Sequence, residues 1–192
     1  MPARNDAALA FLTARRSRPA KLFTHPIPDR DQVTEILTAA TRVPDHGKLE
    51  PWRLIVVQGA GFQRLADLAE AIATEQGSDA ERIAKGRGQF DAGKLAVVVI
   101  ASPKPSPKIP AVEQLMSAAA LCMNLVNAAE AAGWGACWLT GWPAHDAQFA
   151  ARAFGCTAGE TVAGIVHIAT PPADAPDRPR PDLGRIVTWD QP

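Results

Sequence analysis

The sequence lacks tyrosine altogether and has only three cysteines in 192 residues. Cys122, Cys137 and Cys156 are odd in number, widely spaced and contain no CxxC pair. Neither a disulfide framework nor a metal site such as a zinc centre is therefore expected. The first residues also lack the apolar core of a secretory signal, because polar and charged residues already occupy positions 4–6. Reduced, mostly buried thiols and no signal predict a cytoplasmic protein.

An excess of charge of one sign is also missing. The 20 lysines and arginines balance the 20 acidic residues, and the pI is about 6.9. Binding to nucleic acid or to a membrane surface needs an extended basic face, so we expect neither partner. A small anionic ligand remains open, because a few local arginines are enough to bind it.

Helical and strand patterns are mixed along the chain without strict βαβ alternation. Helices are predicted over 6–16, 29–42, 78–92, 110–132 and 144–154 and after Gly59, and strands over 54–57, 95–100, 134–141, 162–169 and 185–189. The continuous apolar run at 95–100 is typical of a central strand buried on both faces. The helix at 110–132 is apolar nearly all round and is expected to be buried. The pattern predicts a single α+β domain over residues 1–192, with a sheet of four or five strands covered by helices.

The sequence Gly59-Ala60-Gly61 between a strand and a helix suggests a dinucleotide-binding fold. The third glycine position is occupied by Arg64, and no second βαβ unit with a suitably placed acidic residue follows. We therefore interpret the segment as a turn and a helix start. A Ser/His hydrolase is also not expected, because GxSxG is absent.

Two basic segments are candidates for anion binding. Arg15-Arg16-Ser17-Arg18 ends the first helix, where cations are favourable to the helix dipole but three arginines exceed what capping needs. Capping and phosphate binding both remain open. The tail from Thr170 to Asp182 holds five prolines and is expected to be extended. It either clasps another subunit or wraps its own domain.

The stretch from Val43 to Arg53 is a charged loop, stiffened by Pro44 and Pro51. Gly47 allows a positive φ between the two prolines. Loops held this stiffly between regular elements often carry function, although the local sequence alone slightly favours a solvated helix–strand connection.

Four segments occur in the order found in one family: Arg15-Arg16-Ser17, residues 42–52, residues 133–141, and the tail with Arg178-Pro179-Arg180-Pro181 and Ile186-Val187-Thr188-Trp189. Over nearly the whole chain, this set resembles the FMN-dependent nitroreductase family, in its short, minimal branch. The resemblance implies a mostly antiparallel sheet and a homodimer with FMN at the subunit interface. It also implies that the C-terminal arm, about residues 170–192, is exchanged with the dimer partner.

The resemblance also assigns residues to FMN. Arg15, Arg16 and Ser17 would contact its phosphate and ribityl chain, together with the basic pair of the tail, Arg178 and Arg180. Arg42 would lie near the pyrimidine edge of the flavin, and His46 would reach the flavin of the partner subunit. The backbone of Trp138, Leu139, Thr140 and Gly141 would lie against the ring, with the Thr140–Gly141 turn near N5.

The sequence departs from the family pattern at two places. Many members carry two serines where this chain has Asp45-His46, and an acidic residue where it has Thr140. Substrate preference therefore cannot be carried over. The sequence assigns no acid–base catalytic residue, and a hydrogen-bonding or structural role is expected for His46.

The implied activity is the transfer of a hydride from NAD(P)H through FMN to nitroaromatics, quinones or similar electron-poor acceptors, in a ping-pong cycle. A flavin-binding sensor or carrier with little turnover is an alternative. An interaction module without flavin, whose arginines bind another anion, is a second one.

Overall fold

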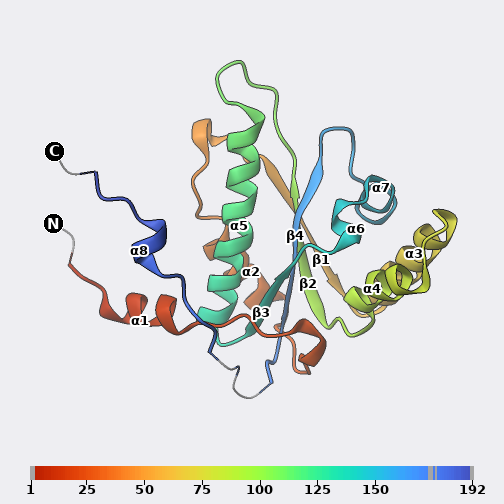
Figure 1. Cartoon of the computed structure of the whole chain (residues 1–192), viewed down its shortest axis with the longest axis horizontal. Coiled ribbons are helices and arrows are strands. Elements are labelled where there is room, and N and C mark those ends of the chain that lie inside the picture. Colours follow the sequence, from red (N-terminus) through yellow and green to blue (C-terminus); the bar gives the residue numbers. More distant parts are fainter. Residues whose placement is uncertain (1–2, 173–174, 176, 191–192) are drawn as a thin grey trace.

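A four-stranded antiparallel sheet separates two layers of helices (Figure 1). The computed structural model describes residues 3–172, 175 and 177–190. The strands are β1 (Trp52–Gln58), β2 (Leu95–Ala101), β3 (Gly135–Leu139) and β4 (Thr161–Ala169), in the order β1-β2-β4-β3. Every neighbouring pair is antiparallel. The predicted α+β class and the antiparallel sheet of four or five strands are confirmed.

β2 lies between β1 and β4, and all of its residues are buried. Leu95, Val97 and Val99 pack into one apolar cluster with α2 (Arg30–Ala40) and α5 (Ala111–Ala131). Ala96, Val98 and Ile100 point to the opposite face. There they pack with α3 (Ala60–Glu75), α4 (Ala80–Asp91), α6 (Trp142–His145) and α7 (Ala147–Phe154). The prediction of a central strand buried on both faces is confirmed.

Local signals in the sequence explain where most helices begin and end. Asp29 and Gln32 form a capping box at the start of α2, as their spacing predicts. Gly59, with φ +55°, turns the chain from β1 into α3. The helix predicted over 144–154 is broken at Asp146, whose side chain accepts a hydrogen bond from the N–H of Phe149 and starts α7. Gly155 ends α7 in the left-handed conformation.

A bulge changes which side chains of β4 face each layer. Val99 of β2 pairs with Gly164, but Ile100 pairs with Val162, so Ala163 has no partner in the register. The indole N–H of Trp138 donates to the carbonyl of Ala163 at 3.2 Å. Val162 therefore faces the same cluster as Ile165, although plain alternation places these two residues on opposite faces.

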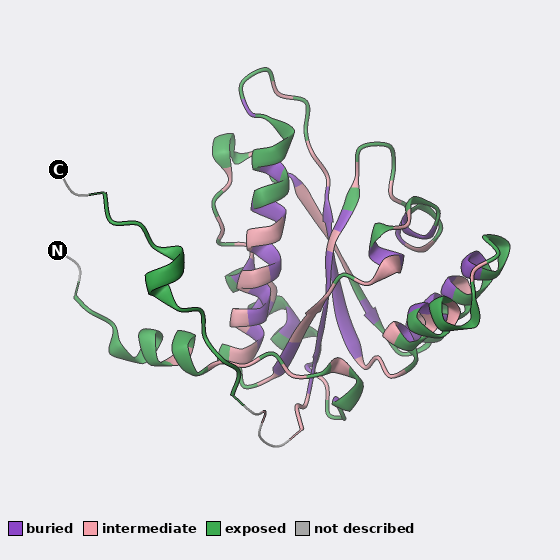
Figure 2. Ribbon diagram, viewed as in Figure 1, coloured by how far each residue is buried: buried purple, intermediate pink, exposed green. Residues whose placement is uncertain are grey.

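The prediction that α5 is buried all round is wrong. Its inner side packs on the sheet, whereas Val112, Leu115 and Met116 are 54%, 47% and 63% exposed. Figure 2 shows buried residues on the side of α5 toward the sheet and exposed or partly exposed residues on the other side. No helix in the described part of the chain has the length and apolarity to cross a membrane.

The N-terminal and C-terminal segments lie on the same side of the domain. The chain begins with α1 (Asp6–Ala14), and the short 3₁₀ helices η1 (Ala20–Leu22) and η2 (His46–Lys48) follow α1 and α2. The tail forms one helical turn, α8 (Leu183–Ile186), where the sequence predicts a strand over 185–189. That prediction is wrong, because the carboxylate of Asp182 caps a turn by accepting from the N–H of Gly184. Residues 173, 174, 176, 191 and 192 of the predicted arm lie outside the described residues.

Candidate functional site

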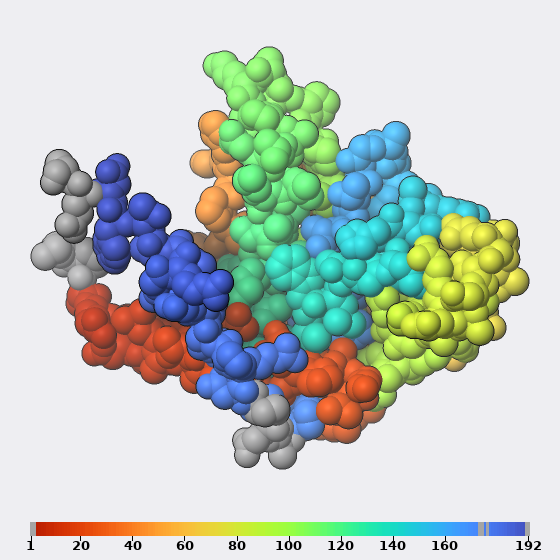
Figure 3. All heavy atoms as spheres, in the orientation of Figure 1, coloured from red at the N-terminus to blue at the C-terminus, as the bar shows by residue number. Residues whose placement is uncertain are grey.

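The basic residues of the two chain ends line one cavity of about 490 Å³, here called the arginine cavity. The cavity lies between the segment that follows α1 and the returning tail, which are neighbours in Figure 3. Its lining comprises Arg15, Arg16, Ser17, Arg18, Pro19, Cys137, Arg178 and Arg180. The structure thus brings together five of the predicted site residues from segments more than 150 positions apart in the sequence.

Arg16 has two tasks in this cavity. Its guanidinium donates to the carbonyls of Thr13, Ala14 and Arg15 at the end of α1, at 2.8–3.0 Å. The same side chain forms an ion pair with Asp177 of the tail at 2.6 Å. Capping is therefore confirmed for Arg16, and the same guanidinium also pairs with a carboxylate of the tail. Phosphate binding by this residue stays a prediction.

A carboxyl group fixes the arginine segment from the side of α5. Glu130, in the last turns of that helix, accepts a hydrogen bond from the backbone N–H of Arg16 at 3.3 Å. Burial raises the pKa of Glu130, and Arg15, Arg18 and Arg16 act in the opposite direction. The segment is thereby anchored to α5, and its cations are directed to the cavity.

A second cavity of about 530 Å³ adjoins the first and shares Pro19 and Cys137 with it. We call it the apolar cavity, because small and apolar groups of η1, α4, β3 and β4 form most of its wall. Its lining comprises Pro19, Ala20, Lys21, Ala84, Lys85, Gly88, Gln89, Ala92, Gly93, Cys137, Leu139 and His167. A cationic cavity joined to an apolar one suits a ligand with an anionic group at one end and a flat apolar body.

His167 lies at the inner end of the apolar cavity, next to Cys137 on the neighbouring strand. Its side chain is 1% exposed, and its ring lies 5.7 Å from that of Phe62. Burial lowers the pKa of His167 to about 4, so the ring is neutral at pH 7. Within the described residues, His167 Nε2 and Gln89 Oε1 are buried without a hydrogen-bond partner.

The four predicted residues at the end of β3 face different surroundings. Leu139 lines the apolar cavity, whereas the indole of Trp138 points to the other face of the sheet and packs on Gly164. Thr140 is exposed. Gly141 lines a neighbouring hollow of about 500 Å³ that shares Lys85 and Gln89 with the apolar cavity. A Cβ at Gly141 would meet the amide end of Gln89, so that flexible side chain would have to shift to accommodate a larger residue.

Arg42 and His46 lie apart from these cavities and line neither of them. Both belong to the loop between α2 and β1, which packs on α5. His46 is exposed and its Nδ1 lies 2.8 Å from a carboxylate oxygen of Glu113. Asp45 holds the loop together by accepting from the N–H groups of Leu49 and Glu50. Gly47 has φ +74°, as predicted.

Several residues of the apolar cavity were not predicted from the sequence. Lys21 lies in the short 3₁₀ helix η1, and Lys85 and Gln89 lie on a helix of ordinary polar composition. His167 falls in the strand predicted over 162–169, and the sequence assigns it no functional role. The one sequence signal for these residues is the spacing of Lys85 and Gln89, which are one helical turn apart and therefore on one face of the helix. This spacing is too common in helices to identify a site.

Comparisons with known proteins identify the family of the chain. The family model described as "Nitroreductase family" matches residues 12–170. The chain is 34% identical over 164 residues to the Escherichia coli (strain K12) protein named "Putative NAD(P)H nitroreductase YdjA", covering 85% of this chain and 88% of that protein.

Solved structures share the fold over nearly the whole chain. A nitroreductase-like family protein from Bacillus cereus superimposes with a TM-score of 0.81 at 25% identity, covering 98% of each chain. An FMN and NADPH-dependent nitroreductase, NfnB, from a Sphigopyxis strain superimposes with a TM-score of 0.73 at 19% identity, covering 96% of this chain and 99% of NfnB. The order of motifs, the fold and the family match lead to one conclusion: the chain belongs to the nitroreductase family.

Proposed function

We propose that the protein is an FMN-dependent NAD(P)H oxidoreductase that reduces nitroaromatics, quinones or similar electron-poor acceptors. The observation that carries this proposal is the junction of the arginine cavity with the apolar cavity at Pro19 and Cys137. The coarser conclusion, an oxidoreductase of the nitroreductase type, follows from the family and its relatives named as NAD(P)H nitroreductases.

The residues present fit a flavin mononucleotide. Arg15, Arg16, Arg178 and Arg180 supply guanidinium groups for a phosphate, which arginine binds through paired hydrogen bonds. The apolar cavity has a size usual for a small-molecule site, about 300–1,000 Å³. Its buried polar atoms on Gln89 and His167 have no partner among the described residues, as expected of groups that face a ring with polar edges.

FMN, when bound, would supply the redox chemistry for a ping-pong transfer of a hydride from NAD(P)H to the acceptor. The arginines would hold its phosphate, and the walls of the apolar cavity, which include Leu139 of β3, would hold its ring. No acid–base residue is needed in this proposal. His167 is neutral and buried, so its part is to hold the ring rather than to deliver a proton.

Two cations are candidates for the pyrimidine edge of the ring, where a positive charge stabilises the negative charge that develops on reduction. Lys21 lines the apolar cavity of its own chain, whereas Arg42 reaches a flavin only across a subunit interface. Lys21→Ala and Arg42→Ala distinguish them, because loss of the cation in contact should lower the flavin reduction potential. A potential unchanged in Arg42→Ala would remove Arg42 from this role.

The proposal includes a homodimer with the flavin at its interface. Large apolar side chains are exposed on α1, α5 and the tail: Leu9, Leu12, Val112, Leu115, Met116, Leu183, Ile186, Val187 and Trp189. Exposed apolar side chains in this number are typical of a subunit interface. The exposed His46 side chain is available to a partner's site. Deletion of residues after Thr170 should therefore produce monomers and release the flavin, and an intact dimer that retains flavin would contradict an exchanged arm.

The first test is an absorption spectrum from 350 to 500 nm after adding FMN and desalting. We expect flavin bands at about one FMN per chain and bleaching by NADH or NADPH. Reoxidation by a nitroaromatic or a quinone, with parallel double-reciprocal plots, would support the ping-pong enzyme. Bound FMN that reoxidises slowly with every acceptor would instead indicate a sensor or carrier. A colourless protein that does not quench FMN fluorescence would refute the flavin site.

A pair of variants tests the arginine cavity. Arg178→Gln should weaken FMN binding about tenfold or more, because hydrogen bonds to a charged phosphate are among the stronger ones. Riboflavin, which has no phosphate, should bind equally well to the wild type and to Arg178→Gln. Arg185→Gln removes an equal charge from the tail outside the cavity lining and should leave both ligands unaffected. Equal losses of FMN affinity in Arg178→Gln and Arg185→Gln would mean that the charge of Arg178 acts only at long range.

A further inference from the structure

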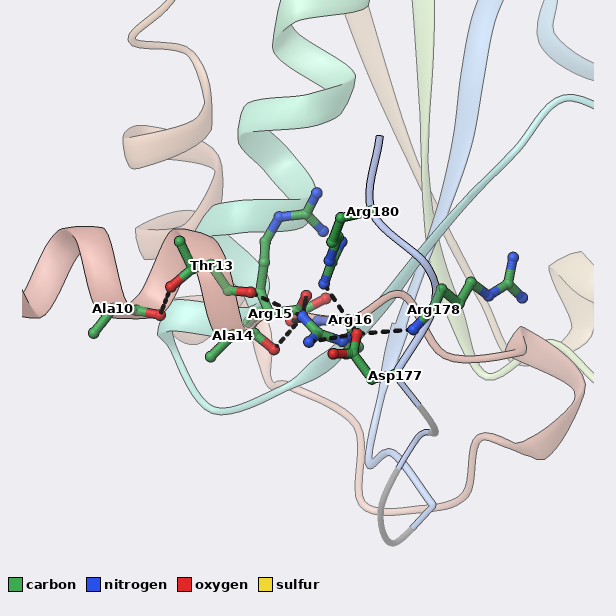
Figure 4. A network of polar contacts seen from close by, with 9 residues as sticks. Ala10, Thr13, Ala14, Arg15, Arg16, Asp177, Arg178 and Arg180 are labelled. Carbon is green, nitrogen blue, oxygen red and sulfur yellow. Dashed lines mark hydrogen bonds and ion pairs between the residues drawn. The ribbon is translucent and has the colours of Figure 1, made fainter. Parts of the chain in front are cut away.

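Asp177 brings a negative charge of the protein itself to the arginine cavity (Figure 4). One of its carboxylate oxygens, Oδ1, lies 2.6 Å from a guanidinium nitrogen of Arg16 and 3.4 Å from one of Arg180. The same oxygen accepts the backbone N–H of Arg178 at 2.8 Å. A single oxygen therefore contacts donors from both walls of the cavity, the segment after α1 and the tail.

This arrangement is the one expected of a bound anion. Phosphate oxygens are also bound by guanidinium groups and backbone N–H groups, and the Asp177 oxygen has both kinds of partner. A phosphate bound by two nitrogens of this guanidinium, the usual arrangement for arginine, needs Nη2, because Nη1 already donates to the carbonyls at the end of α1. Asp177 contacts the same Nη2. A phosphate ligand and Asp177 thus compete for one guanidinium group.

We propose that Asp177 is an internal competitor of the ligand phosphate, and that a phosphate monoester binds by displacing its carboxylate from Arg16. The inference rests on the proposed function for the identity of that ligand as FMN. A phosphate monoester carries about −1.5 to −2 charges and three acceptor oxygens, against one charge on the carboxylate, so the ligand is the stronger partner. Displacement also frees Asp177 from its contact with the segment after α1.

The competition is weak enough to be reversible. Arg16 is 19% exposed, but the side chain of Asp177 is 67% exposed, so water and salt screen the pair. The ligand binds only to molecules in which the Arg16–Asp177 contact is open. Its apparent dissociation constant is therefore the intrinsic constant divided by the fraction of such molecules. For an exposed ion pair we expect a factor of about five, which corresponds to about 1 kcal/mol at 1.4 kcal/mol per tenfold change.

The test compares the full-length protein with Asp177→Asn and, as a matched control, Asp190→Asn. Both variants remove one acidic charge from the tail, but Asp177 contacts Arg16 and Arg180, whereas Asp190 forms no ion pair within the described residues. Inorganic phosphate binding is measured by calorimetry, and FMN and riboflavin binding by fluorescence quenching, all in one buffer of low ionic strength. Asp177→Asn should bind phosphate and FMN about fivefold more tightly and riboflavin unchanged, and Asp190→Asn should stay within twofold of the wild type.

Three results would overturn the inference. Unchanged or weaker phosphate and FMN binding in Asp177→Asn would mean that Asp177 orients Arg16 for the ligand. An equal gain for riboflavin would place the effect outside the phosphate position, and phosphate binding to neither protein would show that the cavity does not take this anion. The proposed function fails separately, if the wild type binds neither flavin; the phosphate titrations then still decide the role of Asp177.

Discussion

β2 and the outer side of α5 are equally apolar in sequence but have opposite environments. Every residue of β2 is buried, because helices of the same chain cover both faces of the sheet. Val112 and Met116 of α5 are more than half exposed, and nothing in the described part of the chain covers them. An apolar run therefore predicts that a surface will be buried. It does not predict whether the elements that bury it belong to the same chain or to a partner.

The largest effect is expected inside β2. Val98→Asp places an unpaired charge between α3 and the sheet, where Val98 is fully buried. We expect a loss of more than about 4 kcal/mol in the free energy of unfolding, enough to abolish folding. Far-UV circular dichroism and urea titration test this. A cooperative transition at the wild-type midpoint would show that this side of β2 is not part of a packed core.

The stability of the protein should depend on pH through His167, a polar group buried in the same core as β2. His167 pairs with Ala96 of β2, and burial lowers its pKa to about 4, against about 6.5 when unfolded. Between pH 7 and pH 5 the unfolded state takes up a proton that the folded state does not, so stability falls as the pH falls, by about 2 kcal/mol in total.

His167→Leu should lack this loss. The difference between the two proteins, measured by urea unfolding at several pH values, removes the contributions of all other groups, including Glu130, whose pKa is raised. Parallel stability curves for wild type and variant would mean that His167 is as well solvated in the folded chain as in the unfolded one.

The smallest effect on the stability of a single subunit is expected on α5. Val112→Asp makes the same chemical change as Val98→Asp, but at an exposed position in the first turn of a helix, where an acidic group is favourable. The monomer should change by less than about 0.5 kcal/mol. Dimerisation, measured by sedimentation velocity, should weaken at least about tenfold. A large loss of monomer stability without any change in association would reverse the comparison.

The sequence predicts most of the fold because its signals are local. The capping box of Asp29 and Gln32, the φ of Gly47 and the run of apolar residues in β2 each depend on a few neighbouring residues. The strand predicted over 185–189 was wrong, because a strand requires a partner that local sequence does not identify. At the bulge, the carbonyl of Ala163 accepts a hydrogen bond from the indole of Trp138 on the neighbouring strand. The local sequence does not predict this contact either.

The candidate site is predicted in part. The grouping of Arg15 to Ser17 with Arg178 and Arg180 came from the family resemblance, and the structure brings these residues into one cavity. Whether they bind FMN stays a prediction, as do the roles of Arg42, His46 and residues 138–141. Lys21, Gln89 and His167 were missed because they come together only when η1, α4 and β4 pack around β3.

The helix α1 is expected to be only marginally stable. It has nine residues and buries none of them, and isolated helices shorter than about 12–15 residues are only marginally stable in water. Its last carbonyls are held by Arg16, the same arginine that contacts Asp177 in the cavity. The amide hydrogens of α1 are therefore among the first to exchange with deuterium, and their exchange rate reports the state of the arginine cavity from outside it.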